Sequence, residues 1–398
     1  MKKLAKEIWI VGAKRTPFGD FSGALRGVSA IDLGVVASKA AIAQSGVPVE
    51  EFDHAIFGNV LQTSTDALYG ARHVGLKSGL GIEVPGLTVN RLCGSGFQVV
   101  INAAQQILLG DSKAVLAAGG ENMSQAPHSI YGLRDGGQRF GRPSPMVDTL
   151  WESLTDSYCD TPMAMTAENI AEKYDVTREH ADTFALRSQK NWAAAQESGG
   201  FAEEMAPVTI TKRRKEIVVD KDEHPRPDTT LESLAKLPPV FKKDGVVTAG
   251  NASGICDGAG AMVVVDGEWG KAQGLKPLAK LVQWGVAGVE PTLMGLGPVP
   301  AIQQGLERAG LTIDDIGLFD VNEAFSSQFL GVQRELGLPE EKTNVNGGAV
   351  ALGHPLGASG ARITTNLIYT ARKRGEKFAV GSACIGGGQG IALVLEMI

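Results

Sequence analysis

Two distant segments of the chain repeat the same order of sequence features, and this repeat constrains the fold more than any other property. In each copy a Val-Asn pair leads through a glycine-rich turn into an apolar helical stretch, a strand-like run and a second glycine turn; the copies begin at Val89 and Val345. Such self-similarity indicates one structural unit used twice. It would place the loops around Cys93 and His354 at equivalent helix starts, facing each other across a pseudo-two-fold axis. A cleft between the halves is then the expected site.

The rest of the chain alternates strand-like runs with helix-like stretches. In the N-terminal part these are 8–11, 29–45, 55–57 and 114–117; in the C-terminal part they are 300–309, 317–321, 323–336, 377–383 and 391–396. This order indicates stacked βαβ units and therefore the α/β class.

Between residues 123 and 249 the alternation stops. This segment is rich in proline, shows one clear helical run near 166–195, and carries a basic stretch at 212–226 whose charge pattern fits a solvated hairpin as well as an anion site. Long excursions from a compact core are usually lids or binding loops, so we expect an inserted loop domain. The two halves would then be residues 1–122 with 250–273, and residues 274–398.

Composition limits the classes of protein. The 398 residues exceed the length of one usual core, and with 43% hydrophobic and 21% charged residues the composition is that of an ordinary soluble enzyme. The net charge of −6 argues against nucleic-acid binding. The chain has no uncharged apolar stretch of about 20 residues, so no membrane span is predicted. The apolar run near the N-terminus stops at Lys14-Arg15, too early for an export signal, which favours a cytoplasmic location.

The four cysteines, Cys93, Cys159, Cys256 and Cys384, show neither a C-x-x-C pair nor matched spacing, so no disulfide and no metal site is predicted. Cys93 instead precedes Gly94-Ser95-Gly96 and an apolar helical run, which suggests a strand-to-helix turn like a nucleophile elbow. The dipole of that helix would favour a thiolate. The alternative is a small core residue.

His354, Asn322 and Cys384 are the other candidates for chemistry. His354 lies in a dense glycine context and is the best candidate base, although a single histidine is by default structural. Cys384 ends a strand and opens a glycine run that leads into another strand, which argues against a dinucleotide motif. Asn322 follows a strand and could donate to an oxyanion or cap the next helix.

Five motifs together resemble the thiolase family over essentially the whole chain. They are Asn90-Arg91-Leu92-Cys93-Gly94-Ser95-Gly96, Gly250-Asn251-Ala252-Ser253-Gly254, Asn322-Glu323-Ala324-Phe325, Asn346-Gly347-Gly348-Ala349 with Gly353-His354-Pro355, and Cys384-Ile385-Gly386-Gly387-Gly388. The resemblance implies a duplicated βαβαβαββ fold in five layers, α-β-α-β-α, with an inserted loop domain that binds coenzyme A. It also implies an acyltransferase with CoA as substrate and no tightly bound cofactor.

The resemblance assigns a role to each catalytic candidate. Cys93 would be the nucleophile that holds the acyl group as a thioester, His354 would activate it, and Cys384 would move the proton at the substrate α-carbon. His354 and a water held by Asn322 would stabilise the thioester enolate. The N–H groups of Cys93 and Gly386 would form a second oxyanion hole, because preorganised donors lower the cost of developing charge.

The same resemblance supplies a CoA-binding set. Arg226 and Ser233 correspond to positions near the adenosine phosphate and base, and Ser253 to a pantetheine contact. The channel wall would be formed by Leu154, Met163, Phe241, Ala249 and Ala324.

Details of the inserted segment point to one subtype of the thiolase family. Short-chain biosynthetic thiolases carry His-Met where this chain has Pro162-Met163, which is the pair of degradative members, and the runs 223–227 and 237–245 look closest to the mitochondrial type. This favours thiolysis of 3-oxoacyl-CoA in fatty acid β-oxidation, with the reverse condensation also possible chemically. The residues 124–142 match a loop used for tetramers, which implies a homotetramer.

Two alternatives remain at this point, and two others are disfavoured. One is a short-chain acetyl-CoA C-acetyltransferase, and a second is a non-catalytic acyl-CoA binding protein. A ketosynthase would carry a second histidine where Cys384 stands, and a papain-like enzyme lacks the duplicated βαβ order.

Overall fold

A computed structural model describes residues 4–134, 140–141 and 144–398. The sheet of the N-terminal half comprises β1 (Ile8–Arg15), β2 (Gly19–Asp20), β3 (His54–Gly58), β4 (Gly86–Val89), β5 (Ala114–Asn122) and β12 (Cys256–Asp266). Its order is β1-β12-β5-β3-β4, with β2 paired to the start of β12. β3 runs parallel to β4 and β5, whereas β12 runs antiparallel to β5 and β1. The parallel pairs are joined by helices, as βαβ connections require.

The sheet of the C-terminal half comprises β13 (Ala279–Gly288), β14 (Leu318–Val321), β15 (Phe378–Ile385) and β16 (Gln389–Met397). Its order is β14-β15-β16-β13, and only β14 and β15 are parallel. β1 pairs on one side with β12 and on the other, over residues 8–10, with β13. One strand therefore joins the two sheets into a continuous hydrogen-bonded system.

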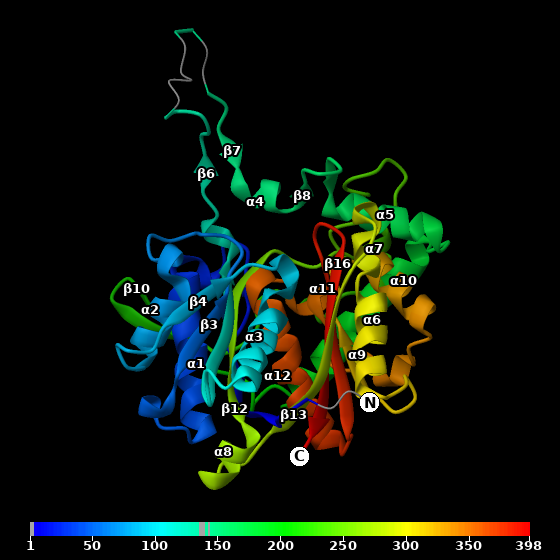
Figure 1. Cartoon of the computed structure of the whole chain (residues 1–398). Helices are drawn as coiled ribbons and strands as arrows, with labels where there is room; N and C mark the ends of the chain where they lie inside the picture. The colour runs from blue at the N-terminus through cyan, green and yellow to red at the C-terminus, as the bar shows by residue number, and fades with distance from the viewer. Residues whose placement is uncertain (1–3, 135–139, 142–143) are drawn as a thin grey trace.

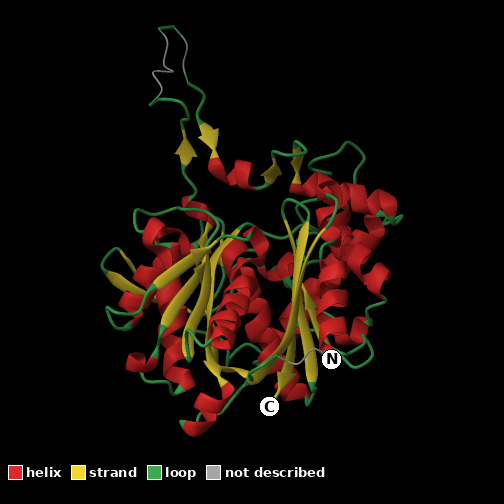
Figure 2. Cartoon of the chain, viewed as in Figure 1, coloured by secondary structure: helices red, strands yellow, loops and turns green. Residues whose placement is uncertain are grey.

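Helices complete five layers (Figures 1 and 2). The outer helices are α1 (Ala30–Ser45) and α2 (Gly70–Ser78) on the N-terminal half and α9 (Pro298–Ala309) and α10 (Ser326–Leu336) on the C-terminal half. The central layer is formed by α3 (Ser95–Leu109) and α12 (Leu356–Arg374), which contact each other and both sheets. The predicted α/β class and α-β-α-β-α layering are confirmed.

The two central helices approach at glycines. A Cβ on Gly96 would lie 2.5 Å from the backbone nitrogen of Ala361, and one on Gly360 would lie 2.3 Å from that of Phe97. α12 is buried on all sides from Leu356 to Ala371, as expected of a helix inside a core. Among the described residues, only the segment 92–109, which contains α3, has the length and apolar composition of a membrane span, and it lies in this core layer.

The segment 123–249 departs from the layered core. Its elements are β6 (His128–Ser129), β7 (Val147–Asp148), α4 (Thr149–Ser153), β8 (Thr155–Asp156), β9 (Thr161–Pro162), α5 (Met163–Lys173), α6 (Arg178–Glu197), β10 (Val208–Lys212), β11 (Lys215–Val219) and α7 (Leu231–Ala235). Figure 1 shows that β6 and β7 rise into an arm that projects from the body of the protein. Two further short helices, α8 (Gly267–Ala272) and α11 (Ala349–Leu352), belong to the halves.

Two details of this segment refine the sequence predictions. The single helix predicted near 166–195 is two helices, because Asp175 adopts a φ of 50° and Thr177 starts α6 by accepting a hydrogen bond from the His180 backbone N–H. The basic stretch forms the β10–β11 hairpin, with Lys212 opposite Lys215, and its strands are largely exposed. The solvated-hairpin interpretation therefore fits its first part.

Buried ion pairs anchor the inserted segment to the core. Arg15, at the end of β1, is fully buried; its Nε donates to Glu204 at 2.6 Å, and its Nη1 and Nη2 donate to the two carboxylate oxygens of Asp222 at 2.7 and 3.0 Å. Asp222 also accepts from the backbone N–H of Phe18. Because both carboxylates come from the inserted segment, one guanidinium holds two parts of that segment against β1.

Candidate active site

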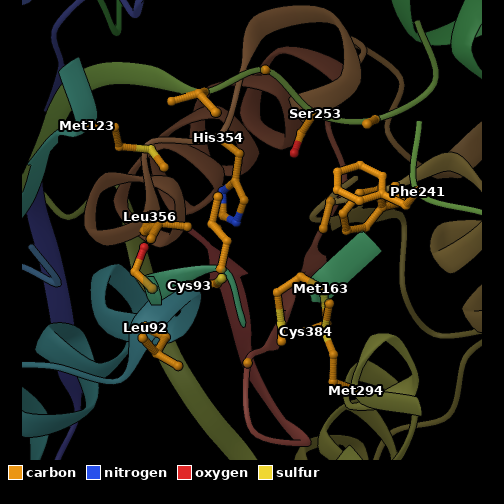
Figure 3. A pocket seen from close by; sticks show the side chains of 18 of the residues that line it. Leu92, Cys93, Met123, Met163, Phe241, Ser253, Met294, His354, Leu356 and Cys384 are labelled. Atoms are coloured by element: carbon orange, nitrogen blue, oxygen red, sulfur yellow. The ribbon is translucent and has the colours of Figure 1, made fainter. Parts of the chain in front are cut away.

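Loops from both halves meet at one end of the central helices and enclose a cavity of about 280 Å³. Cys93 from the N-terminal half and His354 and Cys384 from the C-terminal half line it, and Figure 3 shows their side chains around the same space. The remaining wall is mainly apolar and includes Leu92, Met123, Ile255, Met294, Phe325 and Leu356. Such a cavity excludes water and strengthens electrostatic interactions inside it.

Cys93 lies in a sharp turn between β4 and α3. A short 3-10 turn, Leu92–Gly94, connects the two elements, and Leu92 has a φ of 45°, an uncommon conformation for leucine. Hydrogen bonds hold the turn: Asn90 Oδ1 accepts from the Leu92 N–H, and Ser95 Oγ accepts from the Arg91 N–H while donating to the Leu92 carbonyl. The structure thus has the elbow-like turn predicted from the sequence.

The cavity disfavours the thiolate form of Cys93. Burial raises the pKa of Cys93 to about 11, against the opposing effect of the Gly386 N–H, and the carboxylate of Glu121 raises it further. Loss of hydration thus opposes the thiolate that the dipole of α3 is expected to favour. A base must take this proton before the sulfur can attack a carbonyl.

His354 offers an unprotonated ring nitrogen to that proton. Its side chain is buried, its Nδ1 lies 2.6 Å from Ser359 Oγ, and Ser359 Oγ donates to the Pro355 carbonyl. Since the one hydroxyl proton is used there, Ser359 accepts from Nδ1–H, which leaves Nε2 unprotonated. Burial, with a smaller contribution from Arg362, lowers the pKa of His354 to about 3, so the imidazole is neutral at ordinary pH.

Asn322 lies against this base. Its Nδ2 is 3.3 Å from His354 Nε2, and its buried Oδ1 has no hydrogen-bond partner among the described residues. The helix after it, α10, begins at Ser326 with Phe325 as its N-cap and no side-chain cap. Asn322 therefore does not cap that helix, and its free oxygen can accept a hydrogen bond from a water or a substrate.

Cys384 and Gly386 come from the end of β15 and the turn after it. Cys384 is fully buried, and its pKa is raised above the ordinary range by burial and by the nearby Cys93. The Gly386 N–H reaches the sulfur of Cys93. A Cβ on Gly386 would lie 3.0 Å from Leu92 and 3.4 Å from the Met163 sulfur, so a glycine allows the close approach.

The predicted CoA-binding set divides into two groups. Six members line the cavity: Leu154, Met163, Phe241, Ala249, Ser253 and Ala324. Arg226 and Ser233 do not line it. The Arg226 side chain is 60% exposed and pairs with Asp20 at 3.0 Å, while Ser233 is exposed and caps α7 together with Thr230.

Several residues at the site were missed from the sequence. Ser359, which sets the tautomer of His354, lies within the helix that follows the motif, and its spacing alone carries no signal. Met123, Met294 and Leu356 reach the cavity from three separate segments. Their convergence follows from the tertiary fold and has no counterpart in a local sequence pattern.

Replacing Ser359 by alanine is expected to lower kcat/KM about 5- to 150-fold, since one buried hydrogen bond of about 1–3 kcal/mol would be lost from Nδ1–H. The measurement is steady-state cleavage of acetoacetyl-CoA, with the thermal midpoint recorded in parallel. Ser359→Thr keeps the hydroxyl and should recover part of the activity. Equal activity in Ser359→Ala and the wild type would show that Ser359 does not orient the imidazole.

The neutral thiol predicts a distinctive pH dependence. The pKa of Cys93 near 11 lies above the working range, so its thiolate fraction and its alkylation by iodoacetamide should rise about tenfold per pH unit between roughly pH 6 and 9. Peptide mass spectrometry can follow the reaction, with Cys93→Ala as the blank. A rate that is constant from about pH 6 upward would indicate a preformed thiolate–imidazolium pair and contradict the prediction.

A duplicated α/β fold that brings two cysteines and a neutral histidine to one apolar cavity is the arrangement expected of an acyltransferase that works through cysteine. Residues 8–268 match the family model of the thiolase N-terminal domain, and residues 275–397 match that of the thiolase C-terminal domain. The chain belongs to the thiolase family. The predicted family and the acyltransferase class are thereby confirmed.

Relatives and solved structures agree with this assignment. The mitochondrial 3-ketoacyl-CoA thiolase of Homo sapiens is 52% identical over 393 residues, 99% of each chain, and the acetyl-CoA acetyltransferase of Escherichia coli is 47% identical over 99% of this chain and 100% of its own. The crystal structure of human mitochondrial 3-ketoacyl-CoA thiolase superposes with a TM-score of 0.97 at 52% identity, covering 99% of this chain and 100% of that one. A complex of the human enzyme with CoA gives the same TM-score, covering 100% and 99%.

These names contradict the predicted cytoplasmic location. The human, mouse and bovine relatives are all named mitochondrial, which points to the mitochondrion rather than the cytoplasm. The prediction rested on an ordinary soluble composition and on an N-terminal apolar run too short for an export signal. Those properties separate a secreted protein from one kept in a reducing compartment, but they are shared by proteins of the cytosol and of an organelle.

Proposed function

We propose that this chain catalyses CoA-dependent cleavage of 3-oxoacyl-CoA to acetyl-CoA and a shortened acyl-CoA, and the reverse Claisen condensation, through an acyl-Cys93 intermediate. The observation that carries the proposal is the meeting of Cys93, His354 and Cys384 in one cavity, with the Gly386 N–H at the Cys93 sulfur. A neutral base beside a protonated thiol provides the proton transfer that the first step needs.

In the first half of the proposed reaction, His354 Nε2 takes the Cys93 proton and the sulfur attacks the C3 carbonyl. The C2–C3 bond then breaks, and its electron pair leaves on C2 as the enolate of acetyl-CoA. Cys384 delivers its proton to C2. The N–H groups of Cys93 and Gly386 would hold the oxyanion at C3, whereas His354 and a water on Asn322 would stabilise the enolate, each donor being worth about 3 kcal/mol.

In the second half, a new CoA thiol gives its proton to Cys384 and its sulfur attacks the acyl-Cys93 carbonyl. The bond between the acyl carbon and the Cys93 sulfur breaks, and Cys93 recovers the proton held by His354. Atoms and charges then return to the starting state, with an acyl-CoA released.

The proposed CoA channel runs along the apolar residues Leu154, Met163, Phe241, Ala249 and Ala324, with Ser253 at the pantetheine. Arg226 and Ser233 would contact the adenosine phosphate and base at the outer end; the exposed guanidinium suits a phosphate. We propose accordingly that residues 123–249 act as a CoA-binding loop domain, inserted within an N-terminal half formed by 1–122 with 250–273 and followed by a C-terminal half formed by 274–398.

A degradative role in fatty acid β-oxidation is supported by Pro162 at the start of α5 and by the relatives named 3-ketoacyl-CoA thiolase. The relatives named acetyl-CoA acetyltransferase favour a second candidate, an enzyme confined to four carbons. Measuring kcat/KM on 3-oxoacyl-CoA esters of graded length separates them. Activity on long esters supports the first function, activity on acetoacetyl-CoA alone supports the second, and no cleavage at any length overturns both.

We also propose a homotetramer, in which the projecting arm packs against a second copy of this chain. Its support is a set of large apolar side chains left exposed on the arm, namely Ile130, Tyr131, Leu133, Phe140 and Met146. Residues 135–139 and 142 of the predicted tetramer loop lie outside the described residues. Sedimentation of a variant carrying Ile130→Ser and Leu133→Ser should show dimers; a wild type that sediments as a dimer would exclude the tetramer.

A further inference from the structure

Three side chains that the proposed reaction does not use converge beside the active site. Cys256 at the start of β12 and Asp20 of β2 are direct cross-strand partners, and His224, from the loop after β11, lies with its Nδ1 2.9 Å from Asp20 Oδ1. One potential ligand atom of each residue lies within 4.8 Å of the others. Because the three come from distant positions in the chain, no spacing rule for metal ligands could have found them.

We propose that Asp20, His224 and Cys256 bind a zinc ion. One thiolate, one imidazole and one carboxylate form a donor set that zinc accepts, whereas magnesium and calcium prefer oxygen donors alone. Zinc bonds of about 2.0–2.3 Å in tetrahedral geometry place ligand atoms roughly 3.5 Å apart. Small side-chain rotations therefore suffice to bring the three atoms onto one ion, with a water in the fourth position.

The surroundings of Cys256 favour a cation. The thiol of Cys256 is buried beside the carboxylate of Asp20, its cross-strand partner. The positive groups nearby are already engaged: Arg15 pairs with Asp222, and Arg226 pairs with the second oxygen of Asp20. A divalent ion would replace the thiol proton, which leaves to solvent as the sulfur–metal bond forms.

Access and rigidity also suit a site. The side chains of Asp20 and His224 are 32% and 21% exposed, so an ion can enter from solvent, while Cys256 is fully buried below them. The carboxylate of Glu223, next to His224, accepts from the backbone N–H groups of Asp20 and Ala24. The imidazole and the carboxylate are thus held together before any ion binds.

The site lies directly behind the candidate base. A Cβ on Gly353 would come within 2.1 Å of the Cys256 sulfur, and one on Gly254 within 2.3 Å of the His224 ring. The Gly254 carbonyl accepts from the His354 backbone N–H at 2.9 Å. The Cys256 sulfur and the His224 ring therefore pack against the two glycines that position His354.

Cobalt(II) titration tests the proposal, because a thiolate bound to cobalt gives a charge-transfer absorption and tetrahedral cobalt gives strong visible bands. The full-length double variant Cys93→Ala, Cys384→Ala is used, so that no thiol of the active site can bind the ion. We expect one cobalt per chain, displaced by zinc, with release of one proton.

Matched variants in that background decide the outcome. Cys256→Ser should remove the charge-transfer band, and His224→Asn should weaken binding at least about tenfold, a loss of about 1.4 kcal/mol. His73→Asn alters another His–Asp pair, that of His73 with Asp66, and should change nothing. No band in the double variant, or a band that survives in Cys256→Ser, would overturn the proposal. Circular dichroism and the thermal midpoint establish that each variant is folded.

Discussion

Replacing Cys93 by alanine is expected to abolish thiolysis, with kcat lowered by a factor on the order of 10⁴ or more, as for other enzymes that lose their nucleophile. The neighbouring Cys384 should not substitute, because it is fully buried and burial raises its pKa above the ordinary range. Two measurements check the result: the rate of acetoacetyl-CoA cleavage, and the mass of the intact protein after exposure to acyl-CoA. The wild type should gain one acyl group, and the variant none.

Cys159 provides the matched control. It is also a partly exposed cysteine, but it does not line the cavity. Cys159→Ala should keep both the activity and the acyl adduct. If Cys93→Ala retained activity within about tenfold of the wild type, or still formed the adduct, the acyl-Cys93 intermediate would be wrong.

Replacing Arg15 by methionine should destabilise the protein by about 3–5 kcal/mol, because it leaves two buried carboxylates without their charge partner. Glu204 and Asp222 both depend on this guanidinium, and Asp222 additionally holds the Phe18 backbone. Urea unfolding at fixed protein concentration, followed by tryptophan fluorescence, gives the change in free energy of unfolding.

An exposed ion pair supplies the comparison. Lys77 pairs with Asp32 and Asp66 at the surface, and Lys77→Met should cost about 0–1 kcal/mol, since exposed pairs are screened by water. Similar losses for the two variants would show that burial does not set the importance of the Arg15 network.

Much of the layered core follows from local sequence patterns. The helix expected at 29–45 is α1, and the strands expected at 377–383 and 391–396 are β15 and β16. These elements are mainly apolar runs with glycine at or near their ends, so local propensity and tertiary structure agree. The sequence predicts a single helix near 166–195, because the break depends on the positive φ of Asp175 and the cap at Thr177, neither of which interrupts the helical pattern.

Only those residues of the candidate site that stand in a sequence motif could be predicted. Cys93, His354 and Cys384 stand in recognisable glycine-rich loops and Asn322 in the motif Asn322-Glu323-Ala324-Phe325, and the structure brings them together. The protonation of Cys93 was not predictable, because it depends on how much water the folded cavity removes, and the local sequence suggested the opposite sign. Arg226 lies outside the cavity and pairs with Asp20, so its expected place at the outer end of the CoA channel stays a prediction.

The glycine contact between α3 and α12 constrains the catalytic residues more than it constrains the residues of the inserted segment that line the cavity. Cys93 and His354 stand at the starts of two helices whose backbones touch, at Gly96 and Gly360, inside a layer enclosed by both sheets. A larger side chain at either glycine would push the nucleophile and the base apart together. The residues of the inserted segment that line the cavity, such as Met163 and Phe241, carry no such constraint. Substrate preference can therefore diverge among descendants of this gene while the chemistry is inherited unchanged.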